Sequence, residues 1–210
     1  MSLLAYLEKN FFTKQEMLQK TGLTAGEFDH LQKAQLIPRP SYVTEISVSC
    51  SSFFGPFSES QIIEYYARDS VSWVKLANKL ATGPVAFRLF KQRYQAKISR
   101  LNDLGYLSDH PKVTSGLDQH IVEEWQHFLD GIYGLCTTTG LPEEIAAKEL
   151  AITIIKAFLE KEPLTEDDRR QLKNAVDLLD DVSAPFAPHE IAKSSRQRLI
   201  NEVRETYALA

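Results

Sequence analysis

The chain has 210 residues, of which 43% are hydrophobic, and it contains two cysteines. This length and composition are typical of a globular protein with one large domain, or with a small domain beside a larger one. The net charge of −4 argues against a protein whose whole surface binds nucleic acid or anionic membranes. Two cysteines are too few for a disulfide framework or an all-cysteine zinc site, so we expect a reducing, cytoplasmic environment.

The first twelve residues contain a short apolar run that Glu8 and Lys9 interrupt. They lack the basic leader and the small-residue cleavage site of a secretory signal. Their apolar residues recur at helical spacing and predict a first helix. No apolar stretch in the chain approaches the roughly 20 residues that a membrane-spanning helix needs, so we expect a soluble protein without a membrane partner.

The segment 12–40 predicts two short helices joined by a tight turn at Gly22. Each helix begins with a capping box, in which a glutamate follows a threonine three residues later: Thr13 with Glu16, and Thr24 with Glu27. Apolar residues at helical spacing would form the shared core of the two helices. These residues are Met17, Leu18, Leu23, Phe28, Leu31 and Leu36. The pattern predicts a helix-turn-helix.

This segment resembles the N-terminal DNA-binding module of MerR-type transcription regulators. The resemblance rests on the Thr13 opening, on the turn Thr21-Gly22-Leu23-Thr24, and on the exit Leu36-Ile37-Pro38. It implies a transcription-regulatory protein that binds double-stranded DNA, with the helix at 24–34 approaching the groove. Four basic residues would then contact the phosphates or lie near a wing: Lys14, Lys20, Lys33 and Arg39.

Asp29 departs from that family, which has an arginine at the equivalent position to contact the DNA backbone. An aspartate there would repel phosphate, and the whole module is nearly neutral. The alternative is a protein that binds other proteins or senses a small ligand, with the helix-turn-helix retained as a packing unit. A homodimer is compatible with either hypothesis.

Two further motifs extend the resemblance over the whole chain. Cys50-x-Ser52-Phe53-Phe54-Gly55 and the stretch DGIYGLC at 130–136 are similar to an uncharacterised bacterial family that carries this module. That resemblance implies no known activity.

Alternation of apolar and polar residues over 42–50 predicts the one strand of the chain, either a wing or an exit from the module. The Ser-, Gly- and Pro-containing stretch 51–58 then predicts a domain boundary, with a helix-turn-helix module at 1–57 and a helical bundle at 58–210. We expect the aromatic residues of this stretch to pack between the two domains.

Helical periodicity continues from Ser58, which forms a further capping box with Gln61, to the end of the chain. The pattern predicts an all-α fold with at most one short β segment, in which the small N-terminal module packs on a larger helical bundle. Helices are expected at 58–82, 85–104, 117–133, 142–161, from Thr165 to Pro185, and at 189–207. The helix at 142–161 is apolar round most of its circumference, so we expect it at the centre of the bundle.

The helix at 85–104 carries five basic residues and no acid before its last turn. Arg93, Lys97 and Arg100 share one face of it, which predicts a second nucleic-acid surface. The alternative is a solvent-exposed face whose basic side chains cover apolar surface with their stems.

His120, Glu124 and His127 follow one another at helical spacing, and Glu-x-x-His is the pair that one helix contributes to di-iron bundles. A partner motif on a second bundle helix is missing, and all three residues flank the apolar stripe. The pattern therefore favours a solvated flank, and we predict no metal ligand and no cofactor.

Cys136 lies in the glycine-containing turn 131–140, where a buried, unreactive thiol is the favoured interpretation.

The chain lacks phosphate-binding, dinucleotide-binding, HExxH and GxSxG motifs. These absences favour a non-enzymatic protein. A helical enzyme that uses the Cys136 turn or the His120 face stays open as a third hypothesis.

Overall fold

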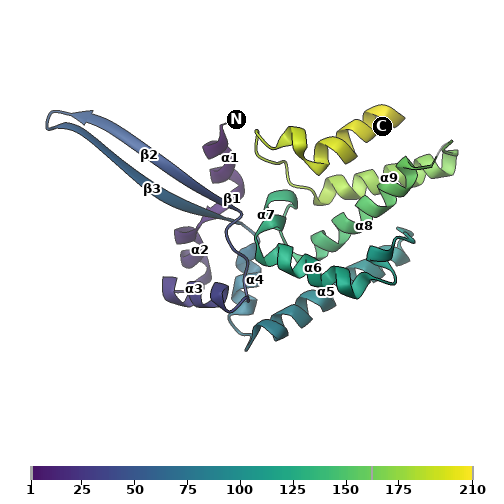
Figure 1. Cartoon of the computed structure of the whole chain (residues 1–210), viewed down its shortest axis with the longest axis horizontal. Coiled ribbons are helices and arrows are strands. Elements are labelled where there is room, and N and C mark those ends of the chain that lie inside the picture. The colour runs from purple at the N-terminus through teal and green to yellow at the C-terminus, as the bar shows by residue number, and fades with distance from the viewer. Residues whose placement is uncertain (1, 162, 210) are drawn as a thin grey trace.

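The computed structural model describes residues 2–161 and 163–209. An N-terminal unit of short helices and a three-stranded sheet packs against a bundle of longer helices (Figure 1). The N-terminal unit contains α1 (Leu3–Asn10), β1 (Phe11–Thr13), α2 (Lys14–Thr21), α3 (Ala25–Lys33), β2 (Tyr42–Ser52) and β3 (Gly55–Ala67). The remaining helices are α4 (Ser70–Ala77), α5 (Gly83–Asp103), α6 (Leu117–Leu129), α7 (Ile132–Cys136), α8 (Pro142–Leu159), α9 (Glu166–Val182) and α10 (Glu202–Tyr207).

The two helices predicted around Gly22 are confirmed as α2 and α3. Both capping boxes are present: the threonine side chain accepts a hydrogen bond from the glutamate backbone, and the glutamate side chain accepts one from the threonine backbone. Gly22 ends α2 with a φ of 75°, a left-handed conformation that glycine adopts at little cost. Local sequence signals therefore determine both helices.

The expectation of an all-α fold is wrong, because the structure contains a three-stranded antiparallel sheet in the order β1-β3-β2. Residues 55–67 form β3, where the sequence pattern predicts the start of a long helix. The Ser58–Gln61 spacing resembles a capping box, but these residues pair with β2 across a hairpin. Serine side chains bond to each other across the hairpin, Ser47 with Ser60 and Ser49 with Ser58. Non-local pairing thus overrides the local helical signal.

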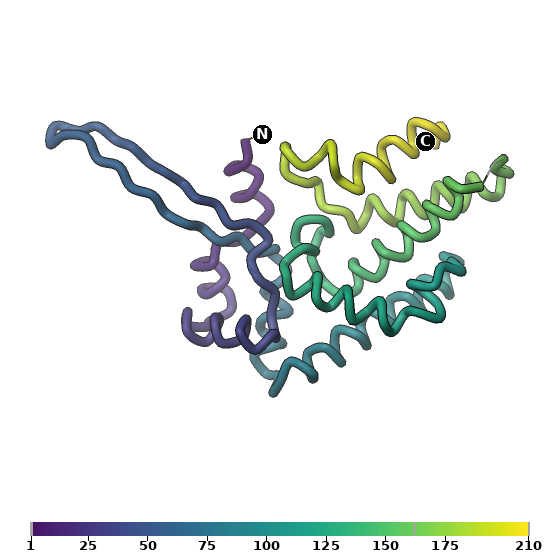
Figure 2. Tube along the Cα trace, in the orientation of Figure 1, coloured from purple at the N-terminus to yellow at the C-terminus, as the bar shows by residue number. Residues whose placement is uncertain are grey.

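The hairpin of β2 and β3 extends away from the helices as a long arm (Figures 1 and 2). The boundary predicted at residue 57 falls inside β3. Phe53 and Phe54 lie at the arm tip with 95% of each residue exposed, so the expectation that they pack between two domains is wrong. The centroids of their two rings lie 5.3 Å apart.

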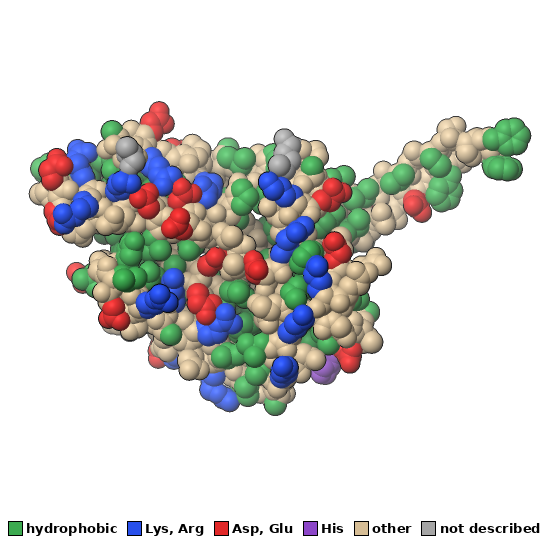
Figure 3. Space-filling view, turned by 180° about the vertical axis from the view of Figure 1, so that it is seen from behind, with side chains coloured by type: hydrophobic (Ala, Val, Ile, Leu, Met, Phe, Trp, Pro, Cys, Tyr) green, Lys and Arg blue, Asp and Glu red, His purple; other side chains and the backbone are tan. Residues whose placement is uncertain are grey.

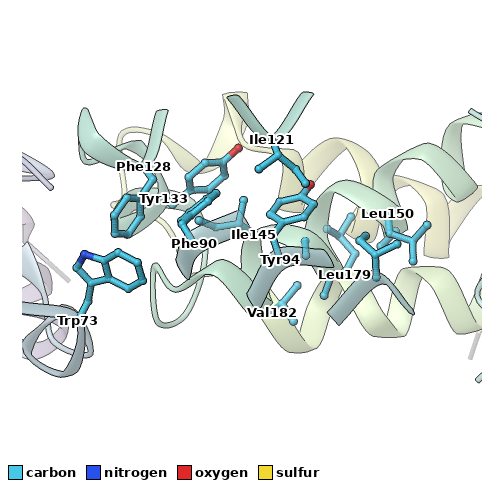
Figure 4. Close-up of a cluster of buried hydrophobic side chains, with 14 of the residues drawn as sticks. Trp73, Phe90, Tyr94, Ile121, Phe128, Tyr133, Ile145, Leu150, Leu179 and Val182 are labelled. Atoms are coloured by element: carbon cyan, nitrogen blue, oxygen red, sulfur yellow. The ribbon is translucent and has the colours of Figure 1, made fainter. Parts of the chain in front are cut away.

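Trp73 on α4 joins the N-terminal unit to the bundle. Its indole is fully buried and lies against the rings of Phe90 and Phe128 (Figure 4). Its Nε1–H donates a hydrogen bond to the backbone carbonyl of Leu36, 2.8 Å away. One continuous apolar core therefore runs from α2 through α4 into the bundle and on to α10.

The central position predicted for the helix at 142–161 is confirmed. This helix, α8, packs against α5 and α9, and its buried residues lie on several sides of it. The last predicted helix is shorter than expected: a 3₁₀ turn at Ile191–Lys193 and a π-helical turn at Gln197–Asn201 precede α10. None of the described helices has the length and apolar character that a bilayer crossing requires.

Candidate nucleic-acid surface and buried polar cluster

Lys14, predicted to contact phosphate, is held by acidic side chains. Its Nζ lies 2.7 Å from a carboxylate oxygen of Asp29 and 3.6 Å from one of Glu64. The hydrogen bond to Asp29 raises the pKa of Lys14 above its usual value. Asp29, the residue that departs from the MerR pattern, therefore neutralises a cation that a DNA-binding module would use.

The other predicted contacts of the N-terminal unit differ in their surroundings. Lys20 places its ammonium 4.5 Å from the ring centroid of Phe12, and Arg68 approaches the same ring at 4.6 Å. Lys33 is exposed at the end of α3. Arg39 is 75% exposed, with Asp130 at 3.8 Å. Arg68 was not predicted, because the sequence pattern placed it inside a long helix.

The arm adds no positive charge to this surface. Residues 41–67 contain three glutamates and neither lysine nor arginine. Seen from behind, the arm carries hydrophobic side chains at its tip and no basic ones (Figure 3). Because non-specific DNA affinity comes mainly from neutralised phosphates, an acidic arm contributes little to DNA binding.

The predicted basic face of α5 is present in part. Arg93, Lys97 and Arg100 line one shallow groove, together with Glu143. Arg93 is engaged, since its guanidinium forms two hydrogen bonds of 2.6 and 2.8 Å to Glu143 and lies 5.6 Å from the Trp73 ring centroid. Lys97 and Arg100 are the members of this face with more freedom to meet an anion.

The expectation of a solvated flank on α6 is wrong for two of its three residues. His120 and Glu124 are each only 3% exposed, and His127 is the one that solvent reaches. The 3₁₀ turn at Pro111–Val113 packs on α6 beside the bundle core. This second contact widens the buried arc of α6 beyond its apolar stripe.

Glu149 of α8 completes the cluster. The Nε2 atom of His120 lies 3.6 Å from Oε1 of Glu124 and 3.7 Å from Oε2 of Glu149. One candidate ligand atom from each of the three residues lies within 4.8 Å of the other two. Both distances from Nε2 are too long for hydrogen bonds.

Several polar atoms of this region have no hydrogen-bond partner within the described part of the chain. They are both ring nitrogens of His120, Oε2 of Glu124 and the hydroxyl of Tyr94. Burial and, to a lesser extent, the charge of the nearby Glu149 raise the pKa of Glu124 to about 8. Burial lowers the pKa of His120 and raises that of Tyr94. Burial thus disfavours the charged forms of Glu124, His120 and Tyr94, and a cation would favour the ionised carboxylate and the neutral imidazole.

Glu149 was missed because it is distant from His120 in sequence and on another helix. A signal did exist: Lys148 and Glu149 are two adjacent charged residues in the middle of a helix that is otherwise apolar round most of its circumference. Charged residues at such positions are almost always paired or bound to a ligand.

Cys136 lies at the end of α7 and is only partly buried, where the sequence predicts a buried thiol. Burial raises the pKa of its thiol, and Lys148 only partly opposes this effect. The Sγ–H donates a weak hydrogen bond to the backbone carbonyl of Ile132, 3.5 Å away. A thiol that stays protonated is a poor nucleophile, so the geometry supports a structural role.

A model of the family described as "Family of unknown function (DUF6058)" matches residues 86–208. The match begins within α5 and includes His120, Glu124 and Glu149, and the helix pair α2 and α3 lies outside it. No curated protein and no solved structure matches the chain. Since the match covers more than half of the residues, the chain belongs to the DUF6058 family, whose function is unknown.

Proposed function

We propose that the chain is a protein-interaction component whose β2–β3 arm docks onto a second copy of the same chain. The observation that carries this proposal is the two-sided character of the arm. Residues paired across a hairpin share a face, so the register places Val48 beside Glu59 and Cys50 beside Phe57. Ile46 and Ile63 extend this mostly apolar face, while the opposite face carries the paired serines.

The rest of the described chain supports the arm only near its base, where Tyr42 donates a hydrogen bond to Glu190 and Lys14 lies 3.6 Å from Glu64. Strand β1 pairs with β3 only at residues 65–67, so most of the arm is a two-stranded ribbon. An isolated two-stranded hairpin is at best marginally stable in water. Natural edge strands are usually blocked by lysine or proline, and β2 contains neither. An arm of this kind gains stability when a partner covers it.

A second copy fits the chemistry of the apolar face. Glu59 is the one charged residue on that face between Thr44 and Ile63, so two identical faces can meet with little repulsion. Two-fold pairing of identical surfaces is also the commonest form of soluble assembly. A basic partner protein would instead be drawn to the acidic side chains of the opposite face.

Val48→Lys is expected to dissociate the dimer, because it places an unpaired charge in the middle of the contact. Val48 is 46% exposed in the single chain, so the substitution leaves the fold intact. Sedimentation equilibrium should show a dimer for the wild type and a dissociation constant at least about tenfold weaker for the variant. Ser49→Lys, on the opposite face, is the matched control and should remain dimeric. A wild type that stays monomeric at every accessible concentration, or equal effects of both variants, would refute the proposal.

Double-stranded DNA binding by α3 is a second candidate. The order α1-β1-α2-α3-β2-β3, with a hairpin after two short helices, is that of a winged helix-turn-helix. This is an analogy of fold, and its support from the site is limited to the exposed His30 and Lys33 and to Lys97 and Arg100 on α5. The negative charges of Asp29 and of the arm would repel DNA phosphates, which favours the first proposal.

Lys33→Glu tests the DNA candidate. If α3 contacts DNA, fluorescence anisotropy on a random duplex should show salt-sensitive binding, and the variant should bind more weakly with a salt slope lower by about 1. Lys156→Glu, an exposed lysine at the end of α8, is the control for net charge. Absence of wild-type binding at low salt would exclude this candidate without affecting the dimer proposal.

A further inference from the structure

We propose that His120, Glu124 and Glu149 bind a divalent first-row transition-metal ion, Zn²⁺ or Mn²⁺, between α6 and α8. This inference is independent of the arm and of any DNA contact. It concerns the region that the family match covers. Helix α6 contributes His120 and Glu124 from successive turns, and α8 contributes Glu149.

Two of the three separations between the side chains are close to those of ligands round one ion, and the third is within 4.8 Å. Two ligand atoms that each lie about 2.1 Å from a tetrahedral ion are about 3.4 Å apart. The separations from His120 Nε2 to the two carboxylates are 3.6 and 3.7 Å. A directly bonded polar network would bring the same atoms to about 2.7–3.2 Å. A small contraction onto a shared ion is therefore sufficient.

Burial without partners is the second observation. Only 3% of the surface of His120 is exposed. Within the described residues, neither of its ring nitrogens has a hydrogen-bond partner. Oε2 of Glu124, equally buried, is also without one. Unpaired buried polar atoms are costly, and an interior histidine–glutamate network would normally satisfy them. An ion at the centre of the cluster would satisfy the imidazole and both carboxylates at once.

The other side of the imidazole also fits a metal ligand. Nδ1 of His120 faces Glu123, with 3.8 Å between Nδ1 and Oε2. Histidines that bind metals usually donate their second N–H to a carboxylate, which fixes the tautomer. Glu123 is 55% exposed and free to shorten this contact. A proton on Nδ1 leaves the lone pair of Nε2 directed at Glu124 and Glu149.

His127 marks the route by which an ion can enter. Its side chain is 48% exposed, and its Nδ1 lies 3.6 Å from Oε1 of Glu124. Three protein ligands leave one position of a tetrahedral ion for a water molecule or for this second imidazole.

The donor set selects the class of metal. One imidazole nitrogen and two carboxylates suit Zn²⁺, Mn²⁺ or Fe²⁺, whereas Mg²⁺ and Ca²⁺ prefer oxygen ligands alone. No thiolate belongs to the three-residue cluster, so a copper(I) or iron–sulfur site is not indicated. Zn²⁺ should bind more tightly than Mn²⁺, in the usual order of stability.

The test uses full-length protein freed of metal by a chelator and then dialysed. Isothermal titration with Zn²⁺ and with Mn²⁺ should show one ion per chain. At a hundredfold excess of Zn²⁺ over its dissociation constant, the melting temperature should rise by about 5–10 °C. Co²⁺, used as a spectroscopic probe, should give the visible absorption of a four- or five-coordinate nitrogen–oxygen site.

Glu149→Gln, which keeps the shape of the side chain, should weaken Zn²⁺ binding by more than about 100-fold, because even groups behind the ligands contribute 10- to 100-fold. Glu124→Gln is the second variant. Without metal it should melt at or above the wild-type temperature, because it removes a buried carboxylate, and with Zn²⁺ it should melt below the wild type. His189→Gln, an exposed histidine outside the cluster, should behave as the wild type. The proposal is overturned if folded metal-free protein binds neither ion, or if both glutamine variants bind Zn²⁺ normally.

Discussion

Trp73→Ala is expected to lower the free energy of unfolding by about 3–5 kcal/mol, the usual cost of truncating a buried large aromatic residue. Trp73 is fully buried, and its ring centroid lies 5.1 Å from that of Phe128 and 6.4 Å from that of Phe90. The variant also leaves the backbone carbonyl of Leu36 without its hydrogen bond. Because α4 lies between the N-terminal unit and the bundle, the loss should affect both.

Urea unfolding followed by circular dichroism measures this effect. Phe54→Ala is the control, since that ring is 95% exposed and its removal should change the stability by no more than about 0.5 kcal/mol. The free energy of unfolding of Trp73→Phe should lie between those of Trp73→Ala and Phe54→Ala. A loss below about 1 kcal/mol for Trp73→Ala would mean that this junction does not hold the two parts together.

Gly131→Ala is expected to cost about 2–4 kcal/mol, from a left-handed backbone and a steric clash together. Gly131 has a φ of 78°, and an added Cβ would lie 2.6 Å from the carbonyl oxygen of Arg39 and 2.9 Å from that of Pro40. Both neighbours are backbone atoms, which cannot move aside cheaply. The carbonyl of Gly131 also accepts a hydrogen bond from the Ser41 hydroxyl at 2.8 Å.

Gly26→Ala is the matched control for this substitution. Gly26 lies in α3 with an ordinary φ and nothing within 4 Å of an added Cβ, so alanine should stabilise the protein by up to about 1 kcal/mol. The same chemical change, from glycine to alanine, should therefore lower the stability at position 131 and raise it at position 26. Urea unfolding of both would contradict the interpretation if Gly131→Ala were as stable as the wild type.

Part of the candidate site was visible in the sequence. His120 and Glu124 stand one helical turn apart, and that spacing alone predicts that they share a face of α6. Whether that face meets water or Glu149 depends on how α6 packs against α8 and against the turn at Pro111–Val113. No local pattern contains that information, and so the prediction of a solvated flank failed.

The basic residues that are free to contact phosphate were also not predictable from the sequence alone. The sequence identifies Lys14 and Arg93 as basic residues on helices, which makes them reasonable contacts for phosphate. Pairing with Asp29 and with Glu143 brings together residues far apart in the chain and neutralises both cations. The number of free cations on a surface therefore follows from the tertiary structure, because an ion pair forms only after its partners have been placed.

Local signals in the sequence are sufficient to predict α2, α3, the turn at Gly22 and the apolar stripes of the bundle helices, because capping boxes and helical periodicity act between residues at most a few positions apart. The strand at residues 55–67 and the meeting of His120, Glu124 and Glu149 in the interior become apparent only in the folded structure. Strand pairing and burial are set by contacts between distant segments. Their free energy exceeds the small local preferences of Ser58, Gln61 and the residues around them.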